Sequence, residues 1–336
     1  MFNPHNPDLA SPSRCADVAL ALRRLMANKS TDDQSEFCAA WLATLQRDIR
    51  QDPRLAADIA ADFARLRVKS PEYQMTLEAL RVWSMCRWLD KGLPVLKPTE
   101  SLAASLVLTQ FKGLLVQDVP LPFDPVLIEV PRPWLPPPFD EIGVIWLYRF
   151  DAVDRKTETE HPFLRVEAVT TSGMAFDKSA RLDGEVERWI ESTDKRPESE
   201  DTTDDEMGVI RLCVRLAVGV AVYMASLTSA GRAAAHRPKA HKKGQPPKPT
   251  AIDQWVLGQD IVLPRELRLL ATDFVQARRK GAGHGGWRLT KRFAVRGHFR
   301  RVVVGPRVEQ HREFHWVRPY MKGPEQGVGL RRAYVL

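Results

Sequence analysis

The chain has 336 residues, 44% of them hydrophobic and 27% charged, a composition that excludes an intrinsically disordered protein and indicates a folded globular one. At this length we expect two or three structural units rather than one core. The net charge of +8 is unevenly distributed: residues 1–227 carry a net charge of −8, whereas residues 228–336 carry 23 basic and 7 acidic side chains, a net charge of +16.

The cysteines are scattered and form no C-x-x-C pair. This spacing argues against a disulfide framework and against a thiolate zinc site, and it favours a reducing cytoplasm. The polar, proline-containing opening MFNPHNPDLASPSR does not resemble a signal peptide. The four cysteines are Cys15, Cys38, Cys86 and Cys213.

Residues 1–95 are expected to form a helical region. Pro53 and Pro71 stand where a first helical turn favours proline, Gly92 marks a helix end, and the group at 31–33 provides a cap. Short connections between the segments favour antiparallel packing. Apolar residues recur at helical spacing over four segments, 13–28, 35–51, 53–69 and 71–92.

Residues 96–227 are expected to form a mixed α/β middle. Three apolar stretches predict strands, at 125–130, 143–153 and 163–173, and a helix is expected at 183–193. The apolar run at 209–227 is interrupted by Arg211 and Arg215, and it falls short of the roughly 20 apolar residues that a membrane span needs. We therefore predict a buried core helix there, and no contact with a membrane.

Residues 228–252 are basic, contain proline and glycine, and lack any periodicity, so they are predicted to form a linker or an exposed arm. Charge of this kind suits a phosphate backbone, although a polybasic linker can also serve solubility alone. The side chains selected here as nucleic-acid ligands are Arg237, Lys239, Lys242 and Lys243.

Residues 253–336 are expected to form a small basic unit with a strand at 255–263, a helix at 264–280 and a β-hairpin. Residues 292–304 alternate almost strictly between two sets of side chains, the segment at 305–307 is a turn, and the return run alternates again. The chain as a whole is therefore predicted to be an α+β protein. The hairpin residues selected as nucleic-acid ligands are Arg296, His298, Arg300, Arg301 and Arg318.

Two other functions of the hairpin compete with nucleic-acid binding. His298 or His315 are the candidates for a general acid or base in RNA cleavage. A divalent metal is the other alternative, because His311, Glu313 and His315 share one face, but HREFH is not the H-E-x-x-H zinc motif. We assign no catalytic residue, no metal and no cofactor.

The C-terminal region carries a signature made of an Arg-Gly-His-aromatic run, a glycine turn, and a tryptophan followed by a proline: Arg296, Gly297, His298, Phe299, Gly305, Trp316 and Pro319. A basic arm precedes it, with Arg237, Pro238, Lys239, Lys242, Lys243 and Gly244. Over residues 207–336 these features resemble a family encoded on phages and plasmids, the type V-A anti-CRISPR proteins that lower expression of the CRISPR nuclease. The resemblance implies that the protein acts in the cytoplasm of a bacterial host cell.

The resemblance implies an adaptor from a mobile element that recognises the nascent N-terminal polypeptide of the nuclease, after which the message is lost. Its expected partners are that peptide and RNA or the ribosome. Two alternatives from other classes stay open: a ribonuclease with the same architecture, and an RNA- or DNA-binding mobile-element protein that shares only the basic C-terminal unit.

Overall fold

The fold is described by a computed structural model of the whole chain. The predicted helix at 53–69 and the side chains of Lys239, Lys242 and Lys243 lie outside the residues described. Those residues are 11–26, 29–51, 71–131, 142–153, 159–170, 175–192, 204–237, 249–263, 265–279, 293–306 and 310–322.

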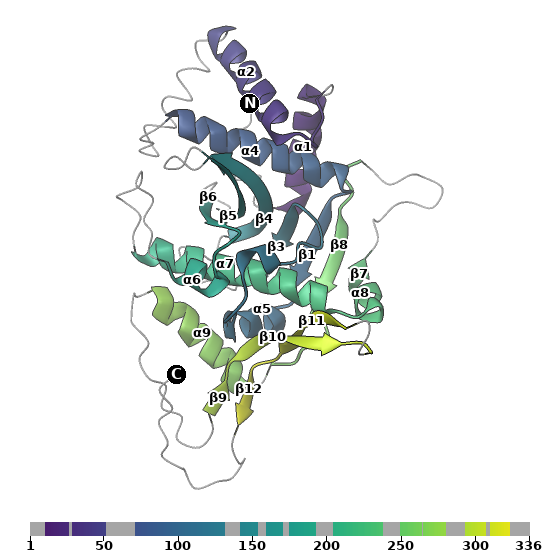
Figure 1. Cartoon of the computed structure of the whole chain (residues 1–336), viewed down its shortest axis with the longest axis vertical. Helices are drawn as coiled ribbons and strands as arrows, with labels where there is room; N and C mark the ends of the chain where they lie inside the picture. The colour runs from purple at the N-terminus through teal and green to yellow at the C-terminus, as the bar shows by residue number, and fades with distance from the viewer. Residues whose placement is uncertain are drawn as a thin grey trace.

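A mixed sheet of seven described strands runs through the middle of the molecule, in the spatial order β6-β5-β4-β3-β1-β8-β7 (Figure 1). Three adjacent strands, β3, β1 and β8, are parallel, and the other neighbours are antiparallel. The strands are β1 (Pro94–Pro98), β3 (Val126–Glu129), β4 (Ile142–Val153), β5 (Glu160–Thr170), β6 (Ala175–Arg181), β7 (His236–Arg237) and β8 (Asp253–Leu257).

Both faces of this sheet are buried, so its strands separate two hydrophobic cores. In β4, Trp146 and Tyr148 enter one core, whereas Ile145 and Leu147 enter the other. Adjacent residues of a strand point to opposite faces, which places them in different cores. A register shift between Ile142 and Val144 marks a β-bulge at the start of this strand.

The N-terminal helices α1 (Pro12–Leu25), α2 (Gln34–Gln51) and α4 (Pro71–Asp90) cover one face of the sheet (Figure 1). The predicted cap at 31–33 is confirmed, because the Asp33 carboxylate accepts a hydrogen bond of 2.8 Å from the Glu36 backbone N–H. Gly92 follows α4 with a φ of 88°, the left-handed conformation that commonly ends a helix.

The other face is covered by α5 (Glu100–Val107), α6 (Val186–Glu191), α7 (Asp204–Ser226) and α9 (Arg265–Arg279). By length and composition Met207–Ser226 could cross a membrane, yet 94% of its apolar window is buried inside the fold. The predicted core helix is thus confirmed in its packing against the sheet. Its burial is possible because Arg215 has acidic and carbonyl partners.

The predicted hairpin forms a second, smaller sheet beneath α5 and α7 (Figure 1). Its strands are β10 (Gly297–Val304) and β11 (His311–Val317), and β10 pairs in parallel with β2 (Thr109–Gln110). A further pair, β9 (Phe293–Val295) and β12 (Tyr320–Lys322), adjoins it in sequence. The predicted continuous strand at 292–304 is therefore divided into two strands at Arg296.

The α+β class is confirmed, and two regions differ in detail from their predictions. The segment predicted as an unstructured linker begins with helix α8 (Ser229–Ala235) and strand β7. Strand β8 lies beside β1 in the central sheet, so the ranges 96–227 and 253–336 contribute to one sheet. Sequence periodicity cannot detect this pairing, because it is set by tertiary contacts far apart in the chain.

Candidate functional site

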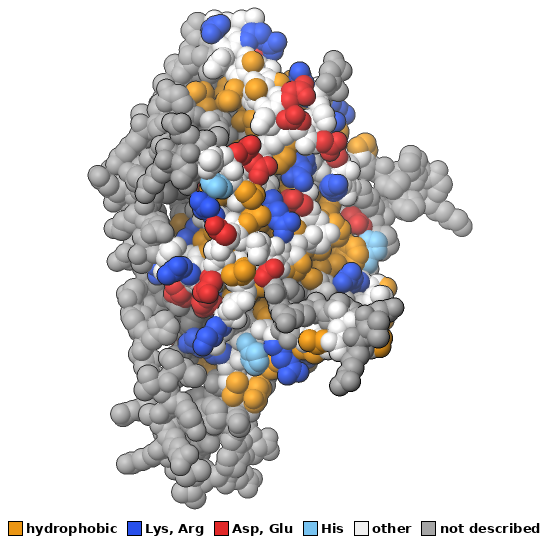
Figure 2. All heavy atoms as spheres, in the orientation of Figure 1, with side chains coloured by type: hydrophobic (Ala, Val, Ile, Leu, Met, Phe, Trp, Pro, Cys, Tyr) orange, Lys and Arg blue, Asp and Glu red, His pale blue; other side chains and the backbone are white. Residues whose placement is uncertain are grey.

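The outer face of the β10–β11 hairpin carries exposed basic and imidazole side chains. His298 and Arg300 are exposed on β10, and His315 is exposed on β11 directly opposite Arg300. Side chains opposite one another in an antiparallel pair have Cβ atoms roughly 5 Å apart. Basic and histidine side chains adjoin one another at the lower end of the surface in Figure 2, where Figure 1 places β10.

Not every hairpin residue selected from the sequence shares this face. The side chain of Arg301, which pairs with Phe314 in the backbone register, lies outside the residues described. Arg296 is partly buried at the break between β9 and β10. The structure brings His298, Arg300 and His315 together on the outer face.

The turn that follows β8 brings together two arginines from distant parts of the chain. Arg237 donates to the Gln259 amide oxygen at 3.1 Å, and Arg318 donates to the Asp260 carboxylate at 2.7 Å. Both arginines are exposed. The beginning of the basic arm and the end of the hairpin therefore meet at Gln259 and Asp260, which are consecutive in the sequence. We call His298, Arg300, His315, Arg318 and Arg237 the basic strip.

Signature residues of the C-terminal region attach the hairpin to the body. Phe299 is buried and stacks on Phe111 with ring centroids 5.6 Å apart. Trp316 packs edge-on against Tyr223 of α7 and donates through Nε1 to the Thr109 hydroxyl at 3.2 Å. These aromatic side chains seal the contact of the hairpin with α7 and with the residue that follows β2, which the sequence pattern alone did not reveal.

Gly297 permits this contact. A Cβ atom at Gly297 would lie 2.6 Å from the Thr109 hydroxyl oxygen, 2.9 Å from Pro319 Cδ and 3.1 Å from the Val317 carbonyl oxygen. Any larger residue would force the β10–β2 pairing apart. The Gly297 and Pro319 positions of the signature are therefore explained by close packing.

Arg215 of α7 stabilises the same junction, at which β2 pairs with β10. Its guanidinium, almost completely buried in α7, donates to the Thr109 carbonyl oxygen. It also forms ion pairs with Glu187 at 2.8 Å and Glu191 at 3.2 Å. Glu187 in turn accepts a hydrogen bond from the Phe111 backbone N–H at 3.0 Å. The interruption of the apolar helix by Arg215 thus satisfies the polar groups at the end of β2.

A second set of buried charges lies between α4 and the sheet. Glu167 on β5 pairs with Arg81 of α4 and lies 3.8 Å from Arg165. Arg165 pairs with Asp177 on β6 at 2.9 Å, and the Tyr148 hydroxyl donates to Glu167 at 3.4 Å. Burial raises the pKa of the Tyr148 phenol, so it stays neutral. We refer to these five residues as the buried charge cluster.

The nucleophilic and metal-binding groups show no catalytic arrangement within the described ranges. Burial raises the pKa of Cys38, Cys86 and Cys213 to about 12, and that of Cys15 further still. The thiolate is the reactive form, so these thiols are inert near neutral pH. The described residues contain no group of three His, Cys, Asp or Glu side chains that could hold a metal ion. The side chains of His311 and Glu313 lie outside the description.

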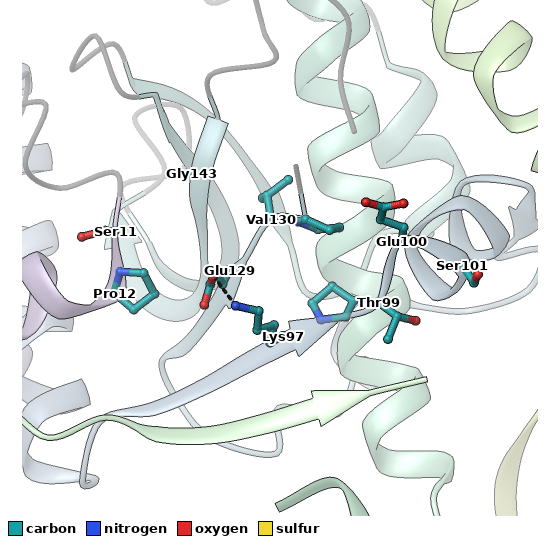
Figure 3. Close-up of a pocket in the computed structure, with 11 residues that line it drawn as sticks. Ser11, Pro12, Lys97, Thr99, Glu100, Ser101, Glu129, Val130 and Gly143 are labelled. Atoms are coloured by element: carbon teal, nitrogen blue, oxygen red, sulfur yellow. Dashed lines mark hydrogen bonds and ion pairs between the residues drawn. The ribbon is translucent and has the colours of Figure 1, made fainter. Parts of the chain in front are cut away.

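An open pocket of about 810 Å³ lies at the carboxyl ends of β1 and β3 (Figure 3). Lys97 and Glu129 form a 2.6 Å ion pair in its wall. Crevices at the carboxyl ends of parallel strands are the usual ligand sites of open α/β sheets. The lining residues are Ser11, Pro12, Lys97, Pro98, Thr99, Glu100, Ser101, Glu129, Val130, Pro131 and Gly143.

Two helix N-termini contribute to this pocket. Ser11 caps α1 by accepting a hydrogen bond from the Arg14 backbone N–H at 3.4 Å, and Thr99 caps α5 by accepting from the Leu102 N–H at 3.3 Å. The Thr99 hydroxyl also donates to the Gly258 carbonyl oxygen at 3.0 Å. The pocket could not be predicted from the sequence, because its walls come from segments near residues 11, 98, 130 and 143. The one local signal was the cap pattern around Thr99.

Comparison with known proteins gives the family of the chain. Residues 96–323, more than half of the chain, match AcrVA2-like, the anti-CRISPR type V subtype A2 family. A crystal structure of AcrVA2 is similar, with a TM-score of 0.46 and 14% sequence identity over 90% of this chain and 97% of that chain. No curated protein matches the sequence. The chain belongs to the anti-CRISPR type V subtype A2 family.

Proposed function

We propose that this anti-CRISPR protein is a cytoplasmic adaptor that recognises the nascent N-terminal polypeptide of a type V-A CRISPR nuclease and causes loss of its message. Membership of the anti-CRISPR type V subtype A2 family carries this proposal. In this view the protein marks a translating ribosome, and the host degrades the message.

The pocket at the ends of β1 and β3 is our candidate for the peptide site. Its volume of about 810 Å³ lies within the range of 300–1,000 Å³ that is typical of ligand sites. Three prolines and Val130 provide apolar contact, and Glu100, Glu129 and Lys97 provide charge. An N-terminal peptide, with an apolar first side chain and an amino group, matches this mixture. The carboxylates of Glu100 and Glu129 would accept hydrogen bonds from the amino group.

The proposal predicts that message loss depends on the encoded peptide rather than on the nucleotide sequence. We expect the nuclease message to fall when the protein is expressed beside a natural start region. A start region recoded with synonymous codons should behave in the same way, because its peptide is unchanged. A start region that encodes a different peptide should protect the message. The measurement is message abundance in cells with and without the protein. Equal loss in all three arms would contradict peptide recognition.

The pocket assignment has its own prediction, at Ser101. Ser101 lies in the first turn of α5 and lines the pocket, so an indole at this position would fill the cavity while the helix stays intact. We expect Ser101→Trp to weaken binding of the N-terminal peptide by about tenfold or more, which corresponds to about 1.4 kcal/mol. Titration calorimetry with the synthetic peptide measures the effect.

Ser101→Ala is the matched control, because it changes the same position and leaves the pocket open. It should bind the peptide as the unmodified protein does. If Ser101→Trp also binds normally, the peptide site lies elsewhere on the molecule. The adaptor function would then be judged by message abundance alone.

A further inference from the structure

We infer that the basic strip is a binding surface for single-stranded RNA. The inference deepens the proposed function, in which the bound RNA would be the message. The two can nevertheless fail separately, because RNA binding is measured on the purified protein without any nascent peptide.

The first argument is the geometry of the outer hairpin face. Arg300 and His315 face each other across the two strands, and His298 lies two residues before Arg300 on the same face. All three side chains are exposed. Positions two residues apart on a strand are separated by roughly 6.5–7 Å, so the strip presents donors at successive points along an extended ligand. Arginine suits phosphate because its planar guanidinium can donate two parallel hydrogen bonds.

The second argument is that the strip extends beyond the hairpin. Val317 pairs with His298, and the next residue is Arg318, which contacts Asp260. Asp260 follows Gln259, the partner of Arg237. Arg318 follows the last residue of β11, so Arg318 and Arg237 meet at the end of the hairpin, and an extended ligand that crosses the outer face past Arg300 and His298 would reach these two arginines at that end. A groove or strip that follows the backbone is the usual means of binding single strands without sequence preference.

The third argument concerns the choice between RNA and an acidic protein. The region from 228 onward has a net charge of +16, which favours a polyanion with dense and regular charge. Exposed rings lie beside the charges: His298, His315 and Tyr320, whose exposed fraction is 44%. Bases that are not paired stack on such rings, whereas bases within a duplex are inaccessible. The surface therefore fits single-stranded RNA best.

An acidic residue beside the strip makes the inference testable in both directions. Asp260 is exposed and neutralises Arg318. An Asp260→Asn substitution would remove a negative charge and free Arg318 for a phosphate. RNA affinity should then rise instead of fall, which loss of folding cannot imitate.

The experiment is fluorescence anisotropy with a labelled polyuridine of about 12 nucleotides, titrated at several salt concentrations between about 50 and 200 mM. We expect Arg300→Ala to weaken binding by about threefold to tenfold, and to reduce the slope of log K against log salt by about 0.7, the loss of one phosphate contact. Asp260→Asn should strengthen binding by about threefold and steepen the slope by about 0.7.

The Arg181–Asp183 pair at the end of β6 provides matched controls. It is an exposed arginine–aspartate pair at 3.1 Å, like Arg318–Asp260, but β6 forms the edge of the central sheet opposite β7. Arg181→Ala and Asp183→Asn should leave polyuridine binding unchanged. If the substitutions at Arg181 and Asp183 change polyuridine binding as much as those in the basic strip, RNA affinity depends only on the net charge of the protein. That result would overturn the inference.

A second probe distinguishes RNA from an acidic protein surface. Polyglutamate of similar length carries charge without bases, so it should bind more weakly than polyuridine and should respond less to the Arg300 substitution. If the strip variants change polyglutamate binding but leave polyuridine binding unchanged, the strip is a protein-binding surface and the RNA inference is wrong.

Discussion

Replacing Glu167 by glutamine is expected to destabilise the protein by about 3 kcal/mol, because it removes the buried carboxylate that Arg81 and Arg165 share and leaves each guanidinium with one remaining acidic partner, Glu78 and Asp177 respectively. Glu167 is fully buried and lies against Arg81 and Arg165, which are themselves buried. Glutamine has nearly the same volume as glutamate, so the loss of stability reflects the removed charge rather than a change in packing. The midpoint of urea unfolding, followed by circular dichroism, measures the change.

Glu129→Gln is the control for this experiment. Glu129 is also a strand carboxylate in an ion pair, but its partner Lys97 is 44% exposed. Exposed pairs contribute about 1 kcal/mol at most, so this substitution should hardly move the unfolding midpoint. If both variants unfold at the same urea concentration, the buried charge cluster provides no net stability and its role would be limited to positioning α4.

Replacing Gly297 by alanine is expected to cost about 2 kcal/mol and to detach the hairpin from β2. The added Cβ would approach the Thr109 hydroxyl oxygen to 2.6 Å, well inside van der Waals contact. Thr109 cannot move freely, because its hydroxyl accepts from Trp316 and donates to the Ser105 carbonyl oxygen. Hydrogen exchange should therefore accelerate at the backbone amides of β10 while the central sheet stays protected.

Gly184→Ala tests whether this effect belongs to the hairpin junction. A Cβ atom at Gly184 would meet only the Arg181 carbonyl oxygen, at an ordinary distance of 3.4 Å. This variant should keep both the stability and the exchange pattern of the unmodified protein. Unchanged protection of β10 in Gly297→Ala would mean that the pairing of β10 with β2 accommodates the added Cβ atom, and it would contradict the prediction.

Local sequence patterns predicted the elements whose structure is set by neighbouring residues. The helix end at Gly92, the cap at Asp33, the strand over residues 143–153 and the turn at Gly305 all depend on short-range geometry. The apolar helix at 209–227 was also predictable, because its arginines made a membrane span unfavourable. In each case the conformational preference and the tertiary fold agree.

The parts that could not be predicted depend on contacts between distant segments. β1 and β2 are short, and they begin or end beside proline or helix residues, so neither has a long enough apolar pattern to indicate a strand. The hairpin alternation was correctly read over 297–300, but it could not show that Phe299 and Trp316 would be covered by Tyr223 and Phe111. The position of Arg318 beside Asp260 likewise depends on the packing of β8 against β1.

The placement of β8 beside β1 has a consequence for synthesis of the protein itself. The edge of β1 is complete only when residues 253–257 have left the ribosome, and α9, which covers α5 and α7, follows later still. Until then an unpaired strand edge and part of the core are open to other chains, a state that promotes aggregation. A fragment that ends before residue 253 is therefore expected to be insoluble, and chaperones that bind emerging chains should increase the yield of the whole protein.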